Sequence, residues 1–183
     1  MKPRNHDPLR LDVESLAKEG GRLQGRWPLA GFERLVESAH AEARPTAADE
    51  VEWQVEGELR PVRGGVPEVW LHLEAQARLQ LECQRCLQPV AAPLAVLRSF
   101  RFVTDEATAA EIDADSEDDV LVLTRALSIH ELVEDELILS LPLVPMHETC
   151  PRPLVAPAAE VAEVEERPNP FAALAALKRK EPH

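Results

Sequence analysis

The chain has 183 residues, a length that suits one domain with appended segments. Its formal net charge of -13 and its 4% aromatic content argue against bulk phosphate binding and against a stacking platform for single strands. No apolar leader follows Met1, no apolar run is long enough to span a membrane, and the number of cysteines is odd. We therefore expect a cytoplasmic protein with reduced cysteines.

The N-terminal part predicts one short strand and one short helix. Apolar residues alternate with polar ones over residues 9–13, which indicates a strand, and Gly20-Gly21 then breaks the chain. Residues 32–40 carry apolar side chains at the i, i+3, i+4 and i+7 positions of an amphipathic helix, which Arg44-Pro45 ends.

The central part predicts an antiparallel hairpin and two further strands. Residues 51–60 and 69–82 alternate between apolar and polar side chains, and the Pro- and Gly-rich link between them has the composition of a turn. Residues 94–103 favour a third strand, and residues 118–123 a short apolar one. The run 105–119, with acidic side chains and no basic one, is interpreted as a solvated, self-repelling loop rather than a metal or partner site.

The C-terminal part begins with a well-marked helix. Ser128 and Glu131 form a capping box, so a helix should run over residues 128–141 and stop at Pro142. The fold class is therefore α+β: an antiparallel sheet or partly open β-barrel within residues 1–150, on which this helix packs.

Two further segments follow this domain. Residues 151–168, rich in Pro, Ala and Glu, form a linker, and residues 169–183 form a short capped helix. Such a short helix is unstable alone, so we expect it to dock on a partner. Its apolar stripe consists of Phe171, Leu174 and Leu177.

Two pairs of metal-ligating residues share a two-residue gap. Cys83 and Cys86 form one pair, and His147 and Cys150 form the other. Thiolate and imidazole ligands together suit zinc, so the four residues are a candidate zinc site. The alternative is a strand-end turn with reduced cysteines and an exposed histidine. A redox role is disfavoured because the first cysteine leaves a strand instead of opening a helix.

Sequence motifs for catalysis are absent, so we expect no catalytic residues and no enzyme. The carboxylates around Glu134 lie three and four residues apart in the predicted helix, which suits an acid/base pair. With no recognisable nucleophile beside them, a solvated helix face is the better interpretation.

Three stretches carry a resemblance to a known family. Cys83-Gln-Arg-Cys-Leu87, the segment from Glu136 to Cys150 and Asn169-Pro-Phe171 match the motifs of the YceD family, the large ribosomal RNA subunit accumulation proteins, with Gly31 to Leu35 as a weaker match. The chain is identified by this resemblance as a member. It implies a bacterial or organellar protein needed for the synthesis, processing or stability of large-subunit ribosomal RNA, and it implies no catalytic residue.

Three functions remain open at this point. The favoured one is a non-enzymatic assembly or stability factor that works through a large-subunit ribosomal protein or precursor particle, because a basic partner suits the acidic loop 105–119 and the acidic tail. The second is a zinc-dependent RNA-binding module whose contacts come from Arg85, Arg98 and Arg101. The third is a hydrolytic enzyme that uses the carboxylates near Glu134.

Overall fold

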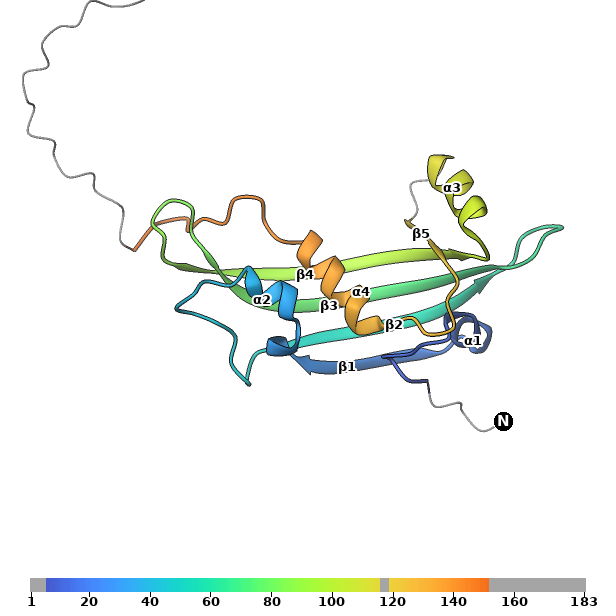
Figure 1. Ribbon diagram of the computed structural model, residues 1–183, viewed down its shortest axis with the longest axis horizontal. Coiled ribbons are helices and arrows are strands. Elements are labelled where there is room, and N and C mark those ends of the chain that lie inside the picture. The colour runs from blue at the N-terminus through green and yellow to red at the C-terminus, as the bar shows by residue number, and fades with distance from the viewer. Residues whose placement is uncertain (1–5, 116–118, 152–183) are drawn as a thin grey trace, which may run out of the picture. The chain divides into compact units, whose positions relative to one another are not determined.

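The computed structural model describes residues 6–115 and 119–151, with the backbone alone for 113–115. Five strands form one sheet in the order β1-β2-β3-β4-β5, antiparallel except for the parallel pair β4–β5 (Figure 1). The sheet is open, which confirms the α+β prediction and its open-sheet form. The elements are α1 (Val13–Glu19), β1 (Arg22–Pro28), the 3₁₀ helix η1 (Leu29–Gly31), α2 (Glu33–Glu37), β2 (Glu50–Arg60), β3 (Glu68–Glu82), β4 (Pro89–Val103), α3 (Glu106–Asp115), β5 (Asp119–Val122) and α4 (Ile129–Leu139).

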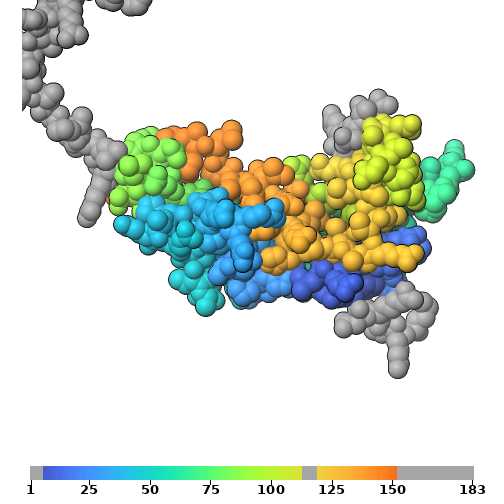
Figure 2. Space-filling model, in the orientation of Figure 1, coloured from blue at the N-terminus to red at the C-terminus, as the bar shows by residue number. Residues whose placement is uncertain are grey.

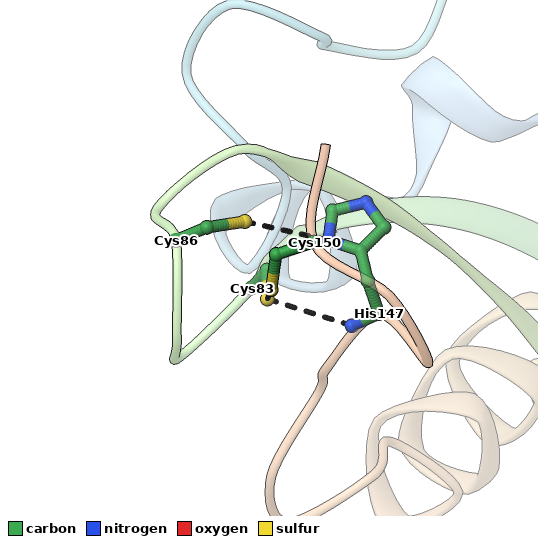
Figure 3. Close-up of side chains that lie close together, drawn as sticks. All are labelled: Cys83, Cys86, His147 and Cys150. Atoms are coloured by element: carbon green, nitrogen blue, oxygen red, sulfur yellow. Dashed lines mark hydrogen bonds between the residues drawn. The ribbon is translucent and has the colours of Figure 1, made fainter. Parts of the chain in front are cut away.

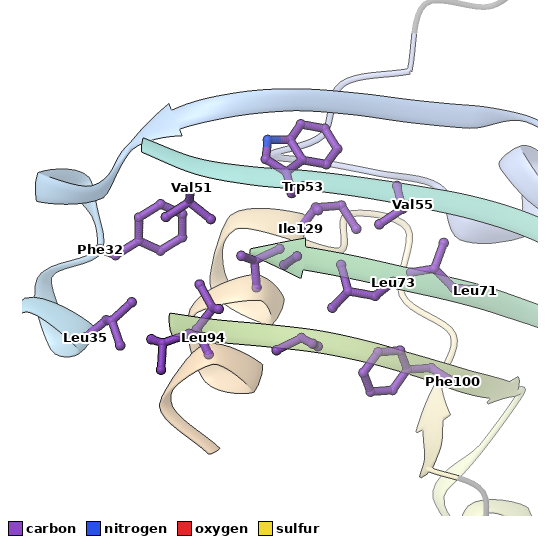
Figure 4. Packing of buried hydrophobic residues seen from close by; sticks show 14 of the residues in the cluster. Phe32, Leu35, Val51, Trp53, Val55, Leu71, Leu73, Leu94, Phe100 and Ile129 are labelled. Atoms are coloured by element: carbon purple, nitrogen blue, oxygen red, sulfur yellow. The ribbon is translucent and has the colours of Figure 1, made fainter. Parts of the chain in front are cut away.

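The predicted hairpin is the centre of the sheet. β2 and β3 pair antiparallel with Val55 opposite Leu73, so the apolar residues of both strands lie on one face. This face carries the core with α1, α2 and α4, whereas the opposite face carries the polar half of each strand (Figures 1 and 4). The sheet therefore has one covered face and one polar face.

Helix α4 packs on the covered face as its sequence predicts. The hydroxyl of Ser128 accepts a hydrogen bond from the backbone N–H of Glu131 at 3.2 Å, which is half of the predicted capping box. Ile129, Val133 and Leu137 are fully buried against the sheet. None of the described helices is long and apolar enough to cross a membrane.

The predicted strand over residues 9–13 is wrong. Leu11 forms an isolated bridge with Leu127, and the side chain of Asp12 accepts a hydrogen bond from the N–H of Ser15, which starts α1. The cap therefore outweighs the short alternating pattern. α1 lies close to β2 because Gly57 has no side chain there: a Cβ at this position would meet the backbone N of Ala17 at 2.6 Å.

Strands β1 and β4 differ from the prediction in extent. β1 was not predicted, since Gly25 and the terminal Pro28 weaken its pattern, yet every residue from Arg22 to Pro28 pairs with β2. β4 begins at Pro89 and includes Pro93. Within the described residues β5 pairs only with the last four residues of β4, so Pro93 lies on an otherwise open edge, where a missing N–H is tolerated.

The acidic run is not simply a loop. Asp105 accepts hydrogen bonds from the N–H and the hydroxyl of Thr108, which lowers the pKa of this carboxyl group, and α3 follows at Glu106. The N-terminal cap and the run of alanines allow a helix despite the charge. The predicted linker 151–168, from residue 152 on, and the predicted helix 169–183 lie outside the described residues.

Candidate metal centre

The turn between β3 and β4 holds the first pair of candidate ligands. Its ends are tied by the N–H of Cys83, which donates to the carbonyl of Gln88 at 3.0 Å, and by the N–H of Leu87, which donates to the carbonyl of Cys83 at 2.8 Å. Leu87 has a φ of 58°, the only positive φ of a non-glycine residue in the described part of the chain. The ring Nε2 of His40 lies 3.1 Å from the Leu87 carbonyl oxygen and fixes this conformation from the other side.

The segment after α4 brings the second pair to this turn. The backbone N–H of Gln84 donates to the carbonyl of Pro145 at 2.9 Å, and the N–H of His147 donates to the Sγ of Cys83 at 3.5 Å. These contacts join segments about sixty residues apart in the sequence. Figure 3 shows the second of them, with His147 beside Cys83. Two elements that are remote in sequence thus meet at one end of the sheet.

The four candidate ligands converge. The Sγ atoms of Cys83, Cys86 and Cys150 and a ring nitrogen of His147 all lie within 4.8 Å of one another. The two cysteine sulfurs of Cys83 and Cys150 are 4.0 Å apart, and the Sγ of Cys86 is 3.4 Å from the Nδ1 of His147. Zn–S bonds of about 2.3 Å in a tetrahedron place sulfurs roughly 3.8 Å apart, so the cluster is close to zinc-binding geometry. All three cysteines are free thiols.

The ring of His147 is oriented for metal binding. Its Nδ1 faces Cys86, while its Nε2 lies 3.1 Å from the carbonyl oxygen of Pro89. Metal-binding histidines use the second nitrogen in this way, because a hydrogen bond to a backbone carbonyl selects the tautomer that leaves the ligating nitrogen unprotonated.

The thiols ionise unequally. Burial opposes ionisation of Cys83, but the N–H groups of His147, Arg85 and Cys86 outweigh it and lower its pKa to about 5. Burial and the neighbouring thiols of Cys86 and Cys83 raise the pKa of Cys150 to about 11. The backbone donors therefore stabilise the thiolate form of Cys83. A divalent cation would supply the positive charge needed to ionise Cys150.

The three arginines of the RNA-binding alternative do not form one surface. Arg98 lies on the covered face, where its Nε is 3.2 Å from the Oε2 of Glu136. Arg101 lies on the polar face in an ion pair of 2.8 Å with Glu68. Arg85 is exposed in the turn beside the cluster. Phe171, Leu174 and Leu177 lie outside the described residues.

Glu134 has a structural role that the sequence did not reveal. Its buried carboxylate accepts hydrogen bonds from the backbone N–H groups of Arg34 and Leu35 at 2.8 and 3.2 Å, and it pairs with the Arg34 guanidinium at 2.9 Å. The carboxylate therefore caps the start of the short helix α2. This use of its oxygens leaves little support for an acid/base pair at Glu134.

The fold and the cluster define a small α+β protein with four converging cysteine and histidine side chains at one end of an open sheet. The chain belongs to the YceD family: the family model described as "Large ribosomal RNA subunit accumulation protein YceD" matches residues 71–178, which include all four candidate ligands.

A curated relative agrees with this assignment. The chain is 35% identical over 122 residues to the large ribosomal RNA subunit accumulation protein YceD of Haemophilus influenzae. The match covers 58% of this chain and 64% of the relative, so the chain spans slightly less than two thirds of that protein. No solved structure matches the chain.

Proposed function

We propose that this protein is a non-enzymatic factor that supports the synthesis, processing or stability of large-subunit ribosomal RNA. The observation that carries this proposal is the family match, which spans both halves of the Cys/His cluster. The name of the relative describes accumulation of the large ribosomal RNA subunit. Because this activity takes place where ribosomes are made, we place the protein in the cytoplasm.

The charges of the chain support a protein partner over direct RNA binding. The chain holds 33 acidic and 20 basic side chains, and several arginines already pair with carboxylates, among them Arg22, Arg26 and Arg101. RNA phosphates would have to break these pairs and meet the remaining acids. A basic protein of the large subunit or of its precursor particle would be attracted electrostatically to the same excess of carboxylates.

Affinity purification of the tagged full-length protein at low salt tests this proposal. We expect one or more large-subunit proteins to remain bound after RNase treatment, because the contact is made to protein. Loss of every partner after RNase would contradict the proposal and favour the RNA-binding alternative. In that case affinity should also fall steeply with salt.

We further propose that Cys83, Cys86, His147 and Cys150 bind one zinc ion. The convergence of four ligand atoms and the orientation of His147 support this. With four protein ligands the tetrahedron is closed, so the metal would hold the turn 83–88 against the segment after α4 instead of activating water.

Metal analysis tests the zinc proposal. Protein purified without chelators should contain one zinc per chain by elemental mass spectrometry, and Cys86→Ser should lower this content. A surface change such as Glu56→Gln serves as a control and should leave it unchanged. Wild-type protein that takes up no metal when refolded with zinc would contradict the proposal.

A further inference from the structure

Many of the exposed large apolar side chains lie in or next to the segments that carry the Cys/His cluster. Nine large apolar residues are exposed in the described part of the chain, and five of them lie in the turn 83–88, at the end of α4 or in the segment that follows it. Figure 2 shows that segment, in orange, against the green turn. The Arg85 guanidinium and the Met146 Sδ are 3.9 Å apart, which places the two parts in contact. We call the following residues the knuckle surface: Leu87, Leu143, Val144 and Met146.

Leu87 is held in a conformation that leucine disfavours. A left-handed backbone costs a residue with a Cβ about 1 kcal/mol, whereas glycine adopts it freely. The side chain is 49% exposed and is not part of the buried core. The turn therefore carries strain and displays an apolar group that the described fold does not use. Backbone strain of this kind often marks a functional position.

The other half of the knuckle surface is held in place before any partner binds. The side chain of Leu143 is fully exposed. Its backbone has restricted freedom because Pro142 precedes it and Pro145 follows two residues later. α4 anchors one end of this segment, and the hydrogen bond from Gln84 to Pro145 anchors the other. A surface fixed in this way binds with a small entropy cost.

Charge indicates the kind of partner. Glu82 directly precedes the turn 83–88 and Glu148 directly follows His147. Both are exposed, and no ion pair among the described residues includes them. None of the four residues is aromatic, so the surface offers no base-stacking platform, and the arginine that contacts it, Arg85, is a single positive charge. An apolar patch with basic residues at its rim complements it.

We propose that the knuckle surface is the docking site for an apolar patch with a basic rim on a protein of the large ribosomal subunit. This inference rests on the proposed function, since it assigns that function's protein contact to named residues. It adds the side chains that make the contact and a reason for the Cys/His cluster, which holds the two halves of the surface together.

Leu87→Gly separates docking from folding. Glycine relieves the left-handed strain, so the variant should unfold at the same or a higher temperature and bind the same amount of zinc. Binding to the RNase-resistant partner identified for the wild type should weaken at least about tenfold, as expected when a contact residue is removed. Equal binding by Leu87→Gly and wild type would overturn the inference while leaving the proposed function intact.

A matched pair of charge substitutions supplies a second measurement. Leu143→Glu places an acid on the knuckle surface, and Leu97→Glu places one at another exposed leucine, on the polar face of the sheet. Both side chains are largely exposed, so neither change should affect stability by more than a surface substitution does. We expect Leu143→Glu alone to lose the partner. Equal loss, or no loss, in the two variants would contradict the inference.

Photo-crosslinking identifies what touches the surface. A benzophenone amino acid at position 143 of the full-length protein should crosslink to a basic large-subunit protein, and the same group at position 97 should not. A crosslink from position 143 to ribosomal RNA or to a second copy of the chain would overturn the inference. So would an absence of crosslinks while the wild type keeps its RNase-resistant partner. If the wild type itself has no such partner, the proposed function fails first.

Discussion

Glu134→Gln tests whether the buried carboxylate is structural. The substitution keeps one carbonyl oxygen for the N–H groups at the start of α2, but its amide group faces the Arg34 guanidinium, so two donors oppose each other. Hydrogen bonds to charged groups contribute about 1.5–3 kcal/mol each, and we expect a loss of about 2 kcal/mol in the free energy of unfolding. For a domain of this size that corresponds to a fall of roughly 4–8 °C in Tm.

The neighbouring carboxylate provides the control. Asp135 also pairs with Arg34, at 2.6 Å, but both side chains of this pair are about half exposed. Asp135→Asn should therefore cost less than about 1 kcal/mol. Thermal and urea unfolding measure both variants, and partner binding is measured well below Tm. If Glu134→Gln keeps the wild-type Tm but abolishes function, the carboxylate acts chemically and the structural account of it is wrong.

Four further predictions concern the fold, a buried acid, the metal and the C-terminal segment. Gly57→Ala should destabilise the protein by about 3 kcal/mol or more, since the new Cβ meets the backbone of α1. The control Gly31→Ala has no neighbour closer than 3.9 Å and should change the stability little. Equal Tm values for the two variants would contradict this. Burial raises the pKa of Glu136, so its ionisation weakens the fold as pH rises above 4.5. Glu136→Gln cannot ionise, and its stability relative to wild type should increase between pH 4.5 and pH 7; a constant difference in urea titrations would refute this. Removal of the proposed zinc by a chelator should speed amide hydrogen exchange in residues 141–151 and leave the central strands protected, because the hydrophobic core forms without the Cys/His cluster. A uniform loss of protection would show a larger role for the metal. Removal of residues 169–183 should preserve Tm and weaken partner binding, and a truncated chain that fails to fold would contradict the proposed docking role.

Elements with strong local signals were predictable from the sequence. The alternation over residues 51–60 and 69–82 gave the hairpin, and the capping box at Ser128 gave the start of α4. Where two local signals competed, the prediction failed. The alternating pattern around Leu11 suggested a strand, but the cap at Asp12 decided for a helix, and the scattered charges after Asp105 concealed α3.

The candidate site was predictable only in part, because its assembly depends on tertiary structure. The two-residue spacings identified the four ligand types, yet their meeting depends on how the segment after α4 returns to the turn 83–88. The positions of His40 and Leu87 in this arrangement had no sequence signal, since a leucine in a left-handed conformation cannot be recognised from its neighbours. The capping of α2 by Glu134 joins residues about a hundred positions apart and was equally hidden.

Under the proposed function, this member of the YceD family supports the accumulation of large-subunit ribosomal RNA without acting as an enzyme. The most direct measurement is the ratio of large- to small-subunit ribosomal RNA in cells depleted of the protein and complemented with the wild type, Glu134→Gln or Leu87→Gly. We expect the ratio to fall on depletion and to recover with the wild type and, below its Tm, with Glu134→Gln, but not with Leu87→Gly. A ratio that is unchanged by depletion would contradict the proposed function.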